Sequence, residues 1–296
     1  APSPYTPQPR RTVMELTIGS AEHRALYCRT FIETHKPYRP EDLVWPELDA
    51  EGLERLKSLP VWNEAVRTEA ATAVKVQALG RSERDPLLAE AISLQGYEEG
   101  RHASVIAILT RHYRIPTDPF PPPPEPADPT WTFLRTGYGE CLDSFFAFGL
   151  FEIGRRTELF AEELIALFDQ IMQEEARHIL FLVNWAADVR ARRPLLSRPG
   201  FDLRRAWNIG AQAFDRVRGA MAMKGSGSQT GFTMKTHGLV DLSPRSFLEL
   251  CLAENERRLA PYDARLLRPT LTPLAVRTAL RVMPRKRSAP ALKVRT

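Results

Sequence analysis

Two segments of the chain carry the same pattern of acidic and imidazole side chains. They read Glu98-Glu99-Gly-Arg-His102 and Glu174-Glu175-Ala-Arg-His178. In each segment the second glutamate precedes the histidine by three residues, so both side chains project from one face of a helix. A carboxylate and an imidazole on one face suit iron, manganese or zinc. One such pair is ordinary on a helix surface, but two copies on separate helices predict a metal site that the helices share.

Long stretches without glycine or proline predict the helices that must hold these segments. The stretch 62–79 is rich in alanine and valine, and Asp85 and Pro86 are typical of the start of the next helix, 87–113. The other predicted helices cover about 20–33, a short segment that opens at Asp49, 130–155, 162–192, 201–223, 244–259 and 273–282. No segment has the pattern of a strand, so the predicted fold class is all-α.

The helix before the first motif should supply a further carboxylate. Glu69 is the only acidic residue deep inside 62–79, because Glu64 lies nearer the start of this stretch. Glu69 and Glu99 lie 15 residues on either side of position 84, in the predicted turn 80–86. In an antiparallel hairpin both would stand at the same height, about 22 Å from the turn.

The helix before the second motif offers Glu140, Asp143, Glu152 and Glu158. Glu140 and Glu175 are centred on position 157.5, at the predicted junction of the two helices. Glu152 would instead place the turn inside a predicted helix, and it lies about 18 Å along the helix from Glu140. Glu140 is therefore the preferred ligand, with Asp143 one turn along as the alternative.

The segment 115–129 (IPTDPFPPPPEPADP) tests this arrangement independently. Its prolines exclude helix and sheet and predict an extended polyproline II conformation. If all four ligands stand at one level, the second and third helices run parallel and their connection must span the bundle. Fifteen such residues reach about 46 Å, whereas a helix of about 25 residues is roughly 38 Å long. The linker is long enough.

The combined set resembles the ligands of ferritin-like di-iron carboxylate proteins: Glu69, Glu99-x-x-His102, Glu140 and Glu175-x-x-His178. The resemblance covers about residues 62–190. It implies a ferritin-like four-helix bundle at 61–192, with a long proline-rich crossover between helices two and three. Residues 1–60 then form an N-terminal extension, and 193–296 form a C-terminal helical extension with a basic tail. The resemblance also implies two iron ions, or a manganese–iron pair, with dioxygen as co-substrate.

The first glutamate of each motif has a predicted supporting role. Metal-bound imidazoles usually donate their other N–H to a carboxylate. Glu98 and Glu174 would each reach the histidine of the opposing helix, with Arg101 and Arg177 pairing nearby. The alternative interpretation places these four residues at the polar periphery of the bundle.

Two residues of this sequence differ from those of known members of the ferritin-like superfamily, and these differences narrow the range of functions that the resemblance implies. Ile106 stands where ribonucleotide reductase subunits carry a radical tyrosine, and Ile171 stands where related N-oxygenases carry an extra histidine. Extensions nearly as long as the bundle favour an enzyme over an iron store. We therefore expect a di-iron (or Mn/Fe) oxidoreductase of the oxygenase or oxidase type, acting on a small, mostly apolar molecule. The alternatives are an iron-binding or ferroxidase-type protein without an organic substrate, and a scaffold that retains only the bundle.

Residues near the ligands are candidates for a substrate pocket. They are Phe145, Phe146, Phe148 and Phe151 after Glu140, and Thr72, Ala103 and Ile106 about one turn from other ligands. An aromatic cluster at helical spacing more often forms core, but a hydrophobic substrate is expected if part of it lines a cavity. Thr72 is the candidate for a catalytic, proton-relaying hydroxyl.

Composition sets the remaining expectations. The 296 residues carry a formal net charge of +5, with the excess concentrated at 281–296 in a solvated tail, so no nucleic-acid partner is expected. Three scattered cysteines indicate reduced thiols in a cytoplasmic protein, and no apolar run is long enough to span a membrane. An external electron donor and a homodimer are both compatible with this chain. The remaining histidines are interpreted as surface or structural: His23, His35, His112 and His237.

Overall fold

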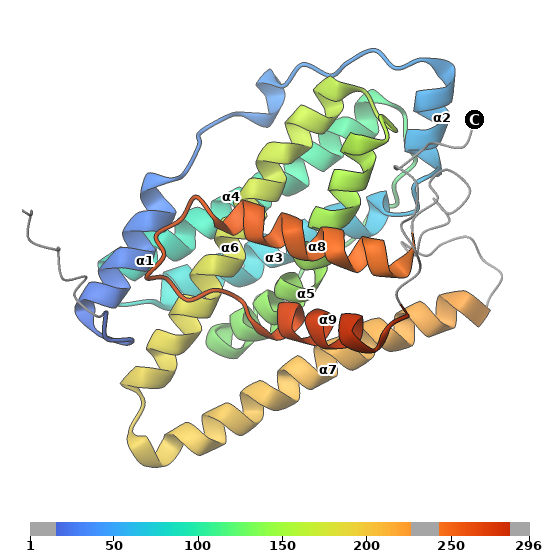
Figure 1. The fold of residues 1–296 in the computed structure, drawn as a ribbon. Helices are drawn as coiled ribbons and strands as arrows, with labels where there is room; N and C mark the ends of the chain where they lie inside the picture. The colour runs from blue at the N-terminus through green and yellow to red at the C-terminus, as the bar shows by residue number, and fades with distance from the viewer. Residues whose placement is uncertain (1–15, 226–242, 285–296) are drawn as a thin grey trace, which may run out of the picture.

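Helices account for all regular secondary structure in the residues that the computed structural model describes, 16–225 and 243–284 (Figure 1). Within these ranges there are nine α-helices, two short 3-10 helices and no strand, which confirms the all-α prediction. The predictions for the first 11 residues, for His237 and for most of the basic tail fall outside the described residues.

Four long helices place the two motifs. They are α3 (Trp62–Ser82), α4 (Pro86–His112), α5 (Pro129–Arg156) and α6 (Glu162–Arg192). The start of α4 shows why the sequence predicts these bounds closely. Pro86 occupies the first turn, and the Asp85 side chain accepts hydrogen bonds from the backbone N–H groups of Leu87 and Leu88.

Glycines allow α3 and α4 to pack closely. A Cβ added at Gly96 would lie 3.0 Å from the backbone nitrogen of Gln77, and one at Gly80 would lie 2.6 Å from Ser93 Oγ. The two helices therefore run antiparallel. The midpoint in sequence of both contacting pairs, Gln77 with Gly96 and Gly80 with Ser93, is position 86.5 rather than the predicted 84. The difference arises because the first turn of α4 extends past the end of α3. This register puts Glu69 beside His102, as described below.

The direction of α5 follows from its contacts with α6. Gly137 lies against Leu182, and the Ser144 hydroxyl lies 3.4 Å from the Glu175 carboxylate, so residue numbers rise along α5 as they fall along α6. Contacts between α4 and α6 show the same antiparallel relation, since Glu99 approaches His178 and His102 approaches Glu175. Helices α4 and α5 therefore run in the same direction, and the chain between them must return along the helices.

The proline-rich connection makes this return beside α3. Near its start, Asp118 exchanges hydrogen bonds of 2.7 and 3.1 Å with Asn63, in the first turn of α3. Near its end, Glu125 pairs with Arg81 at 2.6 Å, in the last turn of α3. No helix or strand occurs between residues 115 and 128. The predicted extended crossover between the second and third long helices is confirmed.

The remaining helices cover the four long ones. Helix α1 (Ala21–Glu33) packs on α4 and α6, α8 (Pro244–Leu259) packs on α5 and α6, and α7 (Arg198–Gly225) runs along α5 (Figure 1). Helix α9 (Leu271–Val282) contacts α8 and α5, while α2 (Ala50–Ser58) lies near the start of α3. The largest apolar cluster joins residues of α1, such as Tyr27 and Phe31, to residues of α3–α8. The flanking segments thus share the core of the four long helices.

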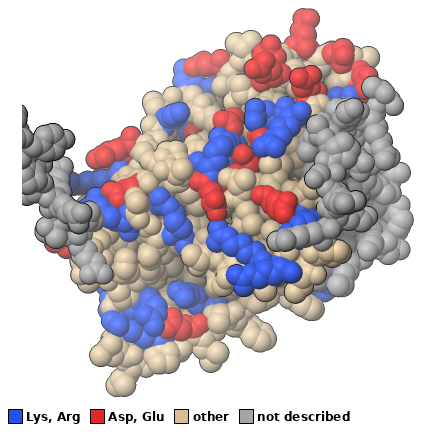
Figure 2. Space-filling model, in the orientation of Figure 1, with Lys and Arg blue, Asp and Glu red and all other residues tan. Residues whose placement is uncertain are grey.

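Basic and acidic side chains are interspersed over the described part of the face shown in Figure 2. None of the described helices is long and apolar enough to cross a membrane. All three cysteines are free thiols; Cys28 and Cys251 are buried and Cys141 is half-buried.

Candidate metal centre

The two Glu-x-x-His motifs meet between α4 and α6. Glu99 and His102 come from α4, and Glu175 and His178 come from α6. One ligand atom of each residue lies within 4.8 Å of one from every other, and all four residues are buried. Their imidazole rings stack with centroids 5.5 Å apart. The predicted convergence of the two motifs is therefore observed, and it produces a group that could hold metal ions.

The outer nitrogen of each imidazole is held by the opposing helix. His102 Nε2 lies 2.8 Å from a carboxylate oxygen of Glu174, and His178 Nε2 lies 2.9 Å from one of Glu98. These are the contacts predicted for the first glutamate of each motif. Each carboxylate accepts a hydrogen bond from an Nε2–H group, so the lone pair of the neutral imidazole lies on Nδ1.

The inner nitrogens face carboxylates without making a hydrogen bond. His102 Nδ1 lies 3.1 Å from Glu175, and His178 Nδ1 lies 3.0 Å from Glu99, yet neither nitrogen has a hydrogen-bond partner of acceptable geometry. A buried nitrogen without a partner is costly unless something else binds it. Two such nitrogens, aimed at carboxylates, fit bound metal ions, whose charge the carboxylates would balance.

Two buried arginines support the outer carboxylates. Arg101 donates to Glu174 at 2.8 Å, and Arg177 donates to Glu98. Each also donates to a backbone carbonyl of the segment after α1, Arg101 to Lys36 and Arg177 to Thr34. The predicted arginine pairing is confirmed, and the N-terminal segment closes this side of the cluster.

His35 belongs to this network, although its spacing gives no sign of it. Its Nδ1 lies 2.5 Å from Glu98, and its side chain is 18% exposed. His35 is thus structural, as predicted, but its contact with the first motif was not predicted. The contact joins a loop to a helix 63 residues away, so no local periodicity could have indicated it. His23 is structural as predicted, because it is buried and bonded to Asn184.

Glu69 and Glu140, the other two predicted ligands, are less buried than the four residues of the two motifs. A Glu69 oxygen lies 3.5 Å from His102 Nδ1, and the Glu69 side chain is 23% exposed. Glu140 is also half-buried, and its charge interacts with those of Glu99, Glu175 and His178. These two carboxylates form a more accessible side of the cluster.

The alternative third-helix ligand points elsewhere. The Asp143 side chain is 61% exposed and pairs with Arg216 of α7. Glu152 is buried, but it is held by Arg155 and Arg156 at 2.6–2.7 Å. Asp143 and Glu152 are therefore both paired with arginines, and Glu140 stays the predicted third-helix ligand.

Burial and crowding decide the protonation of the metal-free cluster. Burial raises the pKa of Glu69 and Glu140, and neighbouring carboxylates raise it further. Burial opposes charge on the two imidazoles, but hydrogen bonds and charges from the glutamates prevail and raise the pKa of His102 and His178. In the metal-free protein, bound protons therefore supply the positive charge that metal ions would supply in this cluster.

The predicted pocket residues do not line the cavity found beside the proline-rich crossover. Phe148 belongs to the main core, Phe145 packs with Cys251 and Val276, and Phe146 stacks on Phe247. Thr72 is buried in α3, one turn from Glu69. The aromatic cluster that follows Glu140 is largely core.

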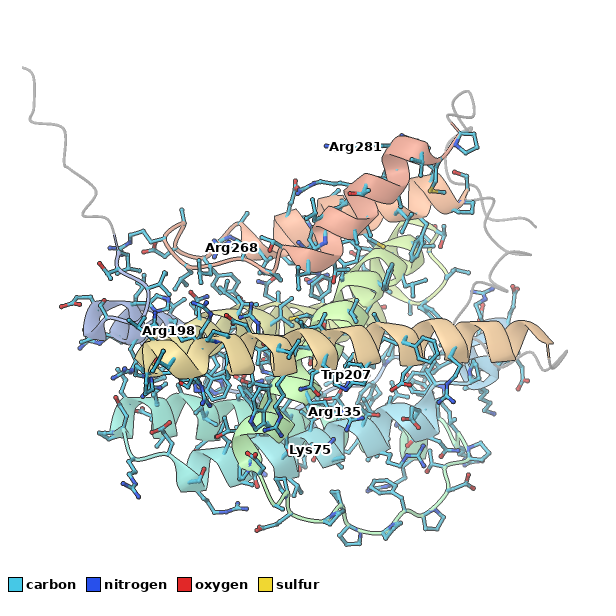
Figure 3. The ribbon with its side chains drawn as sticks, turned by 90° about the horizontal axis from the view of Figure 1, so that it is seen from below. Lys75, Arg135, Arg198, Trp207, Arg268 and Arg281 are labelled. Atoms are coloured by element: carbon cyan, nitrogen blue, oxygen red, sulfur yellow. The ribbon has the colours of Figure 1, made fainter. Side chains whose placement is uncertain are left out.

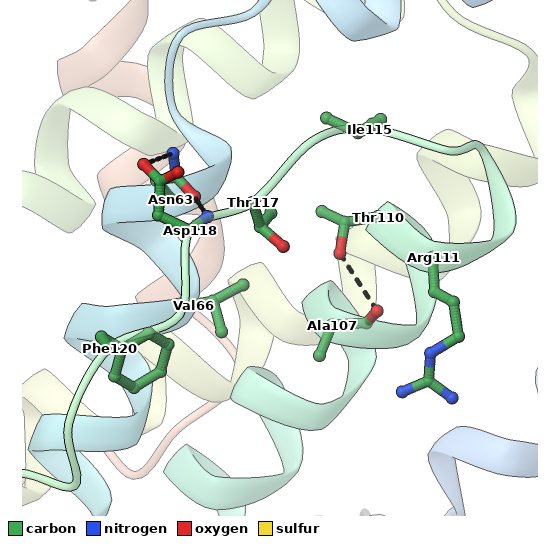
Figure 4. Close-up of a pocket in the computed structure, with 9 residues that line it drawn as sticks. All are labelled: Asn63, Val66, Ala107, Thr110, Arg111, Ile115, Thr117, Asp118 and Phe120. Carbon is green, nitrogen blue, oxygen red and sulfur yellow. Dashed lines mark hydrogen bonds between the residues drawn. The ribbon is translucent and has the colours of Figure 1, made fainter.

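A cavity of about 310 Å³ lies instead between the crossover, the start of α3 and the end of α4 (Figure 4). It is lined by Asn63, Val66, Ala107, Thr110, Arg111, Ile115, Thr117, Asp118 and Phe120. Polar and apolar groups share its wall, and none of the predicted ligands takes part in it. This cavity could not be predicted from the sequence, because the crossover that closes it lacks a chemical motif.

No family model, curated protein or solved structure matches the chain.

Proposed function

We propose that α3–α6 form a ferritin-like bundle that holds two metal ions, most suitably iron, and that the protein is an oxidoreductase using dioxygen. The observation that carries this proposal is the pair of buried, unpartnered Nδ1 atoms, each aimed at a carboxylate of the opposing motif. Mixed imidazole and carboxylate ligands suit iron or manganese better than magnesium or calcium.

The ligands would be Glu69, Glu99, Glu140 and Glu175 with His102 and His178. When bound, an iron pair supplies the redox chemistry by which dioxygen is activated. The residues of the chain itself hold and shield the site. Glu98 and Glu174 fix both imidazoles through Nε2, so their rings have one tautomer and one orientation. Burial of the two motifs excludes water, while the half-buried side at Glu69 and Glu140 gives small molecules a route of approach.

The substrate remains the small, mostly apolar organic molecule of the sequence-based prediction, with Thr72 as the proposed proton-relaying hydroxyl. Closure of one side of the cluster by the segment after α1 supports an enzyme. Packing of the predicted pocket aromatics into the core instead favours the second candidate, a ferroxidase-type protein without an organic substrate.

Metal content and dioxygen consumption test the proposal together. Protein reconstituted anaerobically with ferrous iron should contain about two ions per chain by plasma mass spectrometry. Glu175→Ala should lose most of this metal, whereas Glu152→Ala removes another buried carboxylate, outside the cluster, and should keep it. Equal metal content in both variants, or no bound metal in the unmodified protein, would refute the site.

Dioxygen consumption then separates the two candidates. An oxygenase or oxidase should consume dioxygen repeatedly only with an electron donor or an apolar substrate present. A ferroxidase should consume it in proportion to added ferrous iron alone. Metal-loaded protein that consumes no dioxygen in either assay would contradict both.

A further inference from the structure

The outward face of α7 carries large apolar side chains that remain exposed in the described structure. Leu203, Trp207 and Phe214 are 74%, 77% and 65% exposed. Gly210 lies in the same row, and a Cβ added there would have no heavy atom within 4 Å. The four residues follow one another at steps of four, three and four, the spacing that keeps side chains on one face of a helix. We call these four residues the α7 stripe.

The opposite face of α7 fixes the direction in which the stripe points. Phe201 is 3% exposed and belongs to the main core, and Arg216 pairs with Asp143 of α5. Figure 3 shows α7 across the near side of the molecule, seen from below, with Trp207 labelled beside it. The stripe therefore faces away from the protein. Several large apolar side chains exposed on one face of a helix often mark an interaction site.

We infer that the α7 stripe binds the same stripe of a second copy of this chain, with the two α7 helices antiparallel about a two-fold axis. In this arrangement the stripe of one chain, with side chains in the order large, large, small, large, faces the same stripe running in the opposite direction. Leu203 lies opposite the partner's Phe214, and Trp207 lies opposite the partner's Gly210. Each indole thus enters the open space over a glycine, and the alternation of large and small residues lets the layers interdigitate. Because both contacts occur twice, the interface is self-complementary, as a two-fold dimer requires.

The residues beside the stripe also suit a close helix partner. Ala206 and Ala213 flank it on one side and leave room for the facing backbone. Arg204 is turned toward α5, with its guanidinium 3.9 Å from the centre of the Trp131 ring. No like charges meet at the centre of the antiparallel pair.

These features favour a second copy over a lipid surface. A helix that binds a membrane interface needs a continuous apolar face, with free basic side chains along its polar side. The glycine at the centre of the stripe interrupts such a face, and Arg204 and Arg216 are engaged with α5.

The mass of the full-length protein in solution tests the inference, measured by light scattering after size-exclusion chromatography. The unmodified chain should have twice its mass of 33.5 kDa. Trp207→Asp should give the monomer mass, whereas Val44→Asp, at a loop position that is 84% exposed, should leave the dimer intact. Circular dichroism should show unchanged helix content in both variants, because both positions lie on the surface of the monomer.

Gly210→Leu provides the sharper test. Open space at Gly210 means that the monomer accepts the larger side chain, but the dimer does not, because the partner's Trp207 needs that space. The variant should therefore be monomeric. The same change would strengthen binding to a lipid surface, measured by co-sedimentation with phosphatidylcholine–phosphatidylglycerol vesicles. A monomeric unmodified chain, a dimer unaffected by Gly210→Leu, or vesicle binding that this variant increases would each overturn the inference.

Discussion

Replacement of Glu98 by alanine should show how much the carboxylates behind the proposed ligands contribute to metal binding, because Glu98 is not itself a proposed ligand. Glu98 is fully buried and accepts hydrogen bonds from His178 Nε2, Arg177 and His35. Its pKa is lowered, because hydrogen bonds and positive charges from His178 and Arg177 outweigh the effect of burial. The variant therefore removes a charged acceptor from three groups at once, while all six proposed ligands remain.

Two effects of different size follow. Arg177 keeps only the Thr34 carbonyl as a partner, and breaking a buried ion pair by removing one member costs about 3–5 kcal/mol of unfolding free energy. Loss of the carboxylate behind His178 should weaken metal binding about 10–100-fold, the usual effect of removing such a partner. This corresponds to about 1.4–2.7 kcal/mol of binding free energy.

Urea unfolding of the metal-free protein measures the first effect, and titration of ferrous iron against a chelator under anaerobic conditions measures the second. Glu152→Ala is the matched control, because Glu152 is buried and paired with arginines but lies outside the cluster. It should bind metal like the unmodified protein. If Glu98→Ala also bound metal with unchanged affinity, the carboxylate–imidazole contact would have no role in metal binding, and the proposed orientation of His178 would be refuted.

Three further predictions concern the ligands and the packing beneath them. Metal affinity should fall as the pH is lowered through neutrality, because the raised pKa values of His102 and His178 keep both imidazoles protonated at pH values above the ordinary imidazole pKa of about 6.5. Calorimetry in buffers of different ionisation enthalpy should show that protons are released when metal binds. An affinity that does not depend on pH would contradict this prediction. Glu140→Ala should lower the metal content by about one ion per chain, whereas Asp143→Ala should leave it unchanged; the reverse result would exchange their roles. Gly96→Val should lower the unfolding free energy by about 1–3 kcal/mol in urea titrations, because its side chain would overlap α3; unchanged stability would show that α3 and α4 can separate without cost.

Local signals made the long helices predictable. The limits of α4 follow from a capping carboxylate and a proline at its start, and those of α5 and α6 follow from the junction at 157–161. The Glu-x-x-His geometry is also local, since residues three apart share a helix face whatever surrounds them. The convergence of both motifs could be predicted because it needs only two helices with these faces turned toward each other.

Features that depend on tertiary contacts could not be predicted in the same way. The register of the α3–α4 hairpin depends on the close approach at Gly80 and Gly96, which a turn centred on position 84 does not include. The contact of His35 with Glu98 depends on the path of a loop. The core role of the Phe145 region depends on α8 and α9, which cover it. In each case, the deciding partner lies far away in the sequence.

The crossed contacts explain why each motif begins with two glutamates. Within α4, Glu99 lies beside the Nδ1 of His178, while Glu98 holds the Nε2 of the same ring. The equivalent residues of α6 do the same for His102. Neither helix brackets its own histidine in this way, so an isolated α3–α4 or α5–α6 hairpin would present imidazoles without these partners. The packing of α4 against α6 therefore also assembles the proposed metal site. Metal bound there would stabilise the contact between the two helices that forms the site.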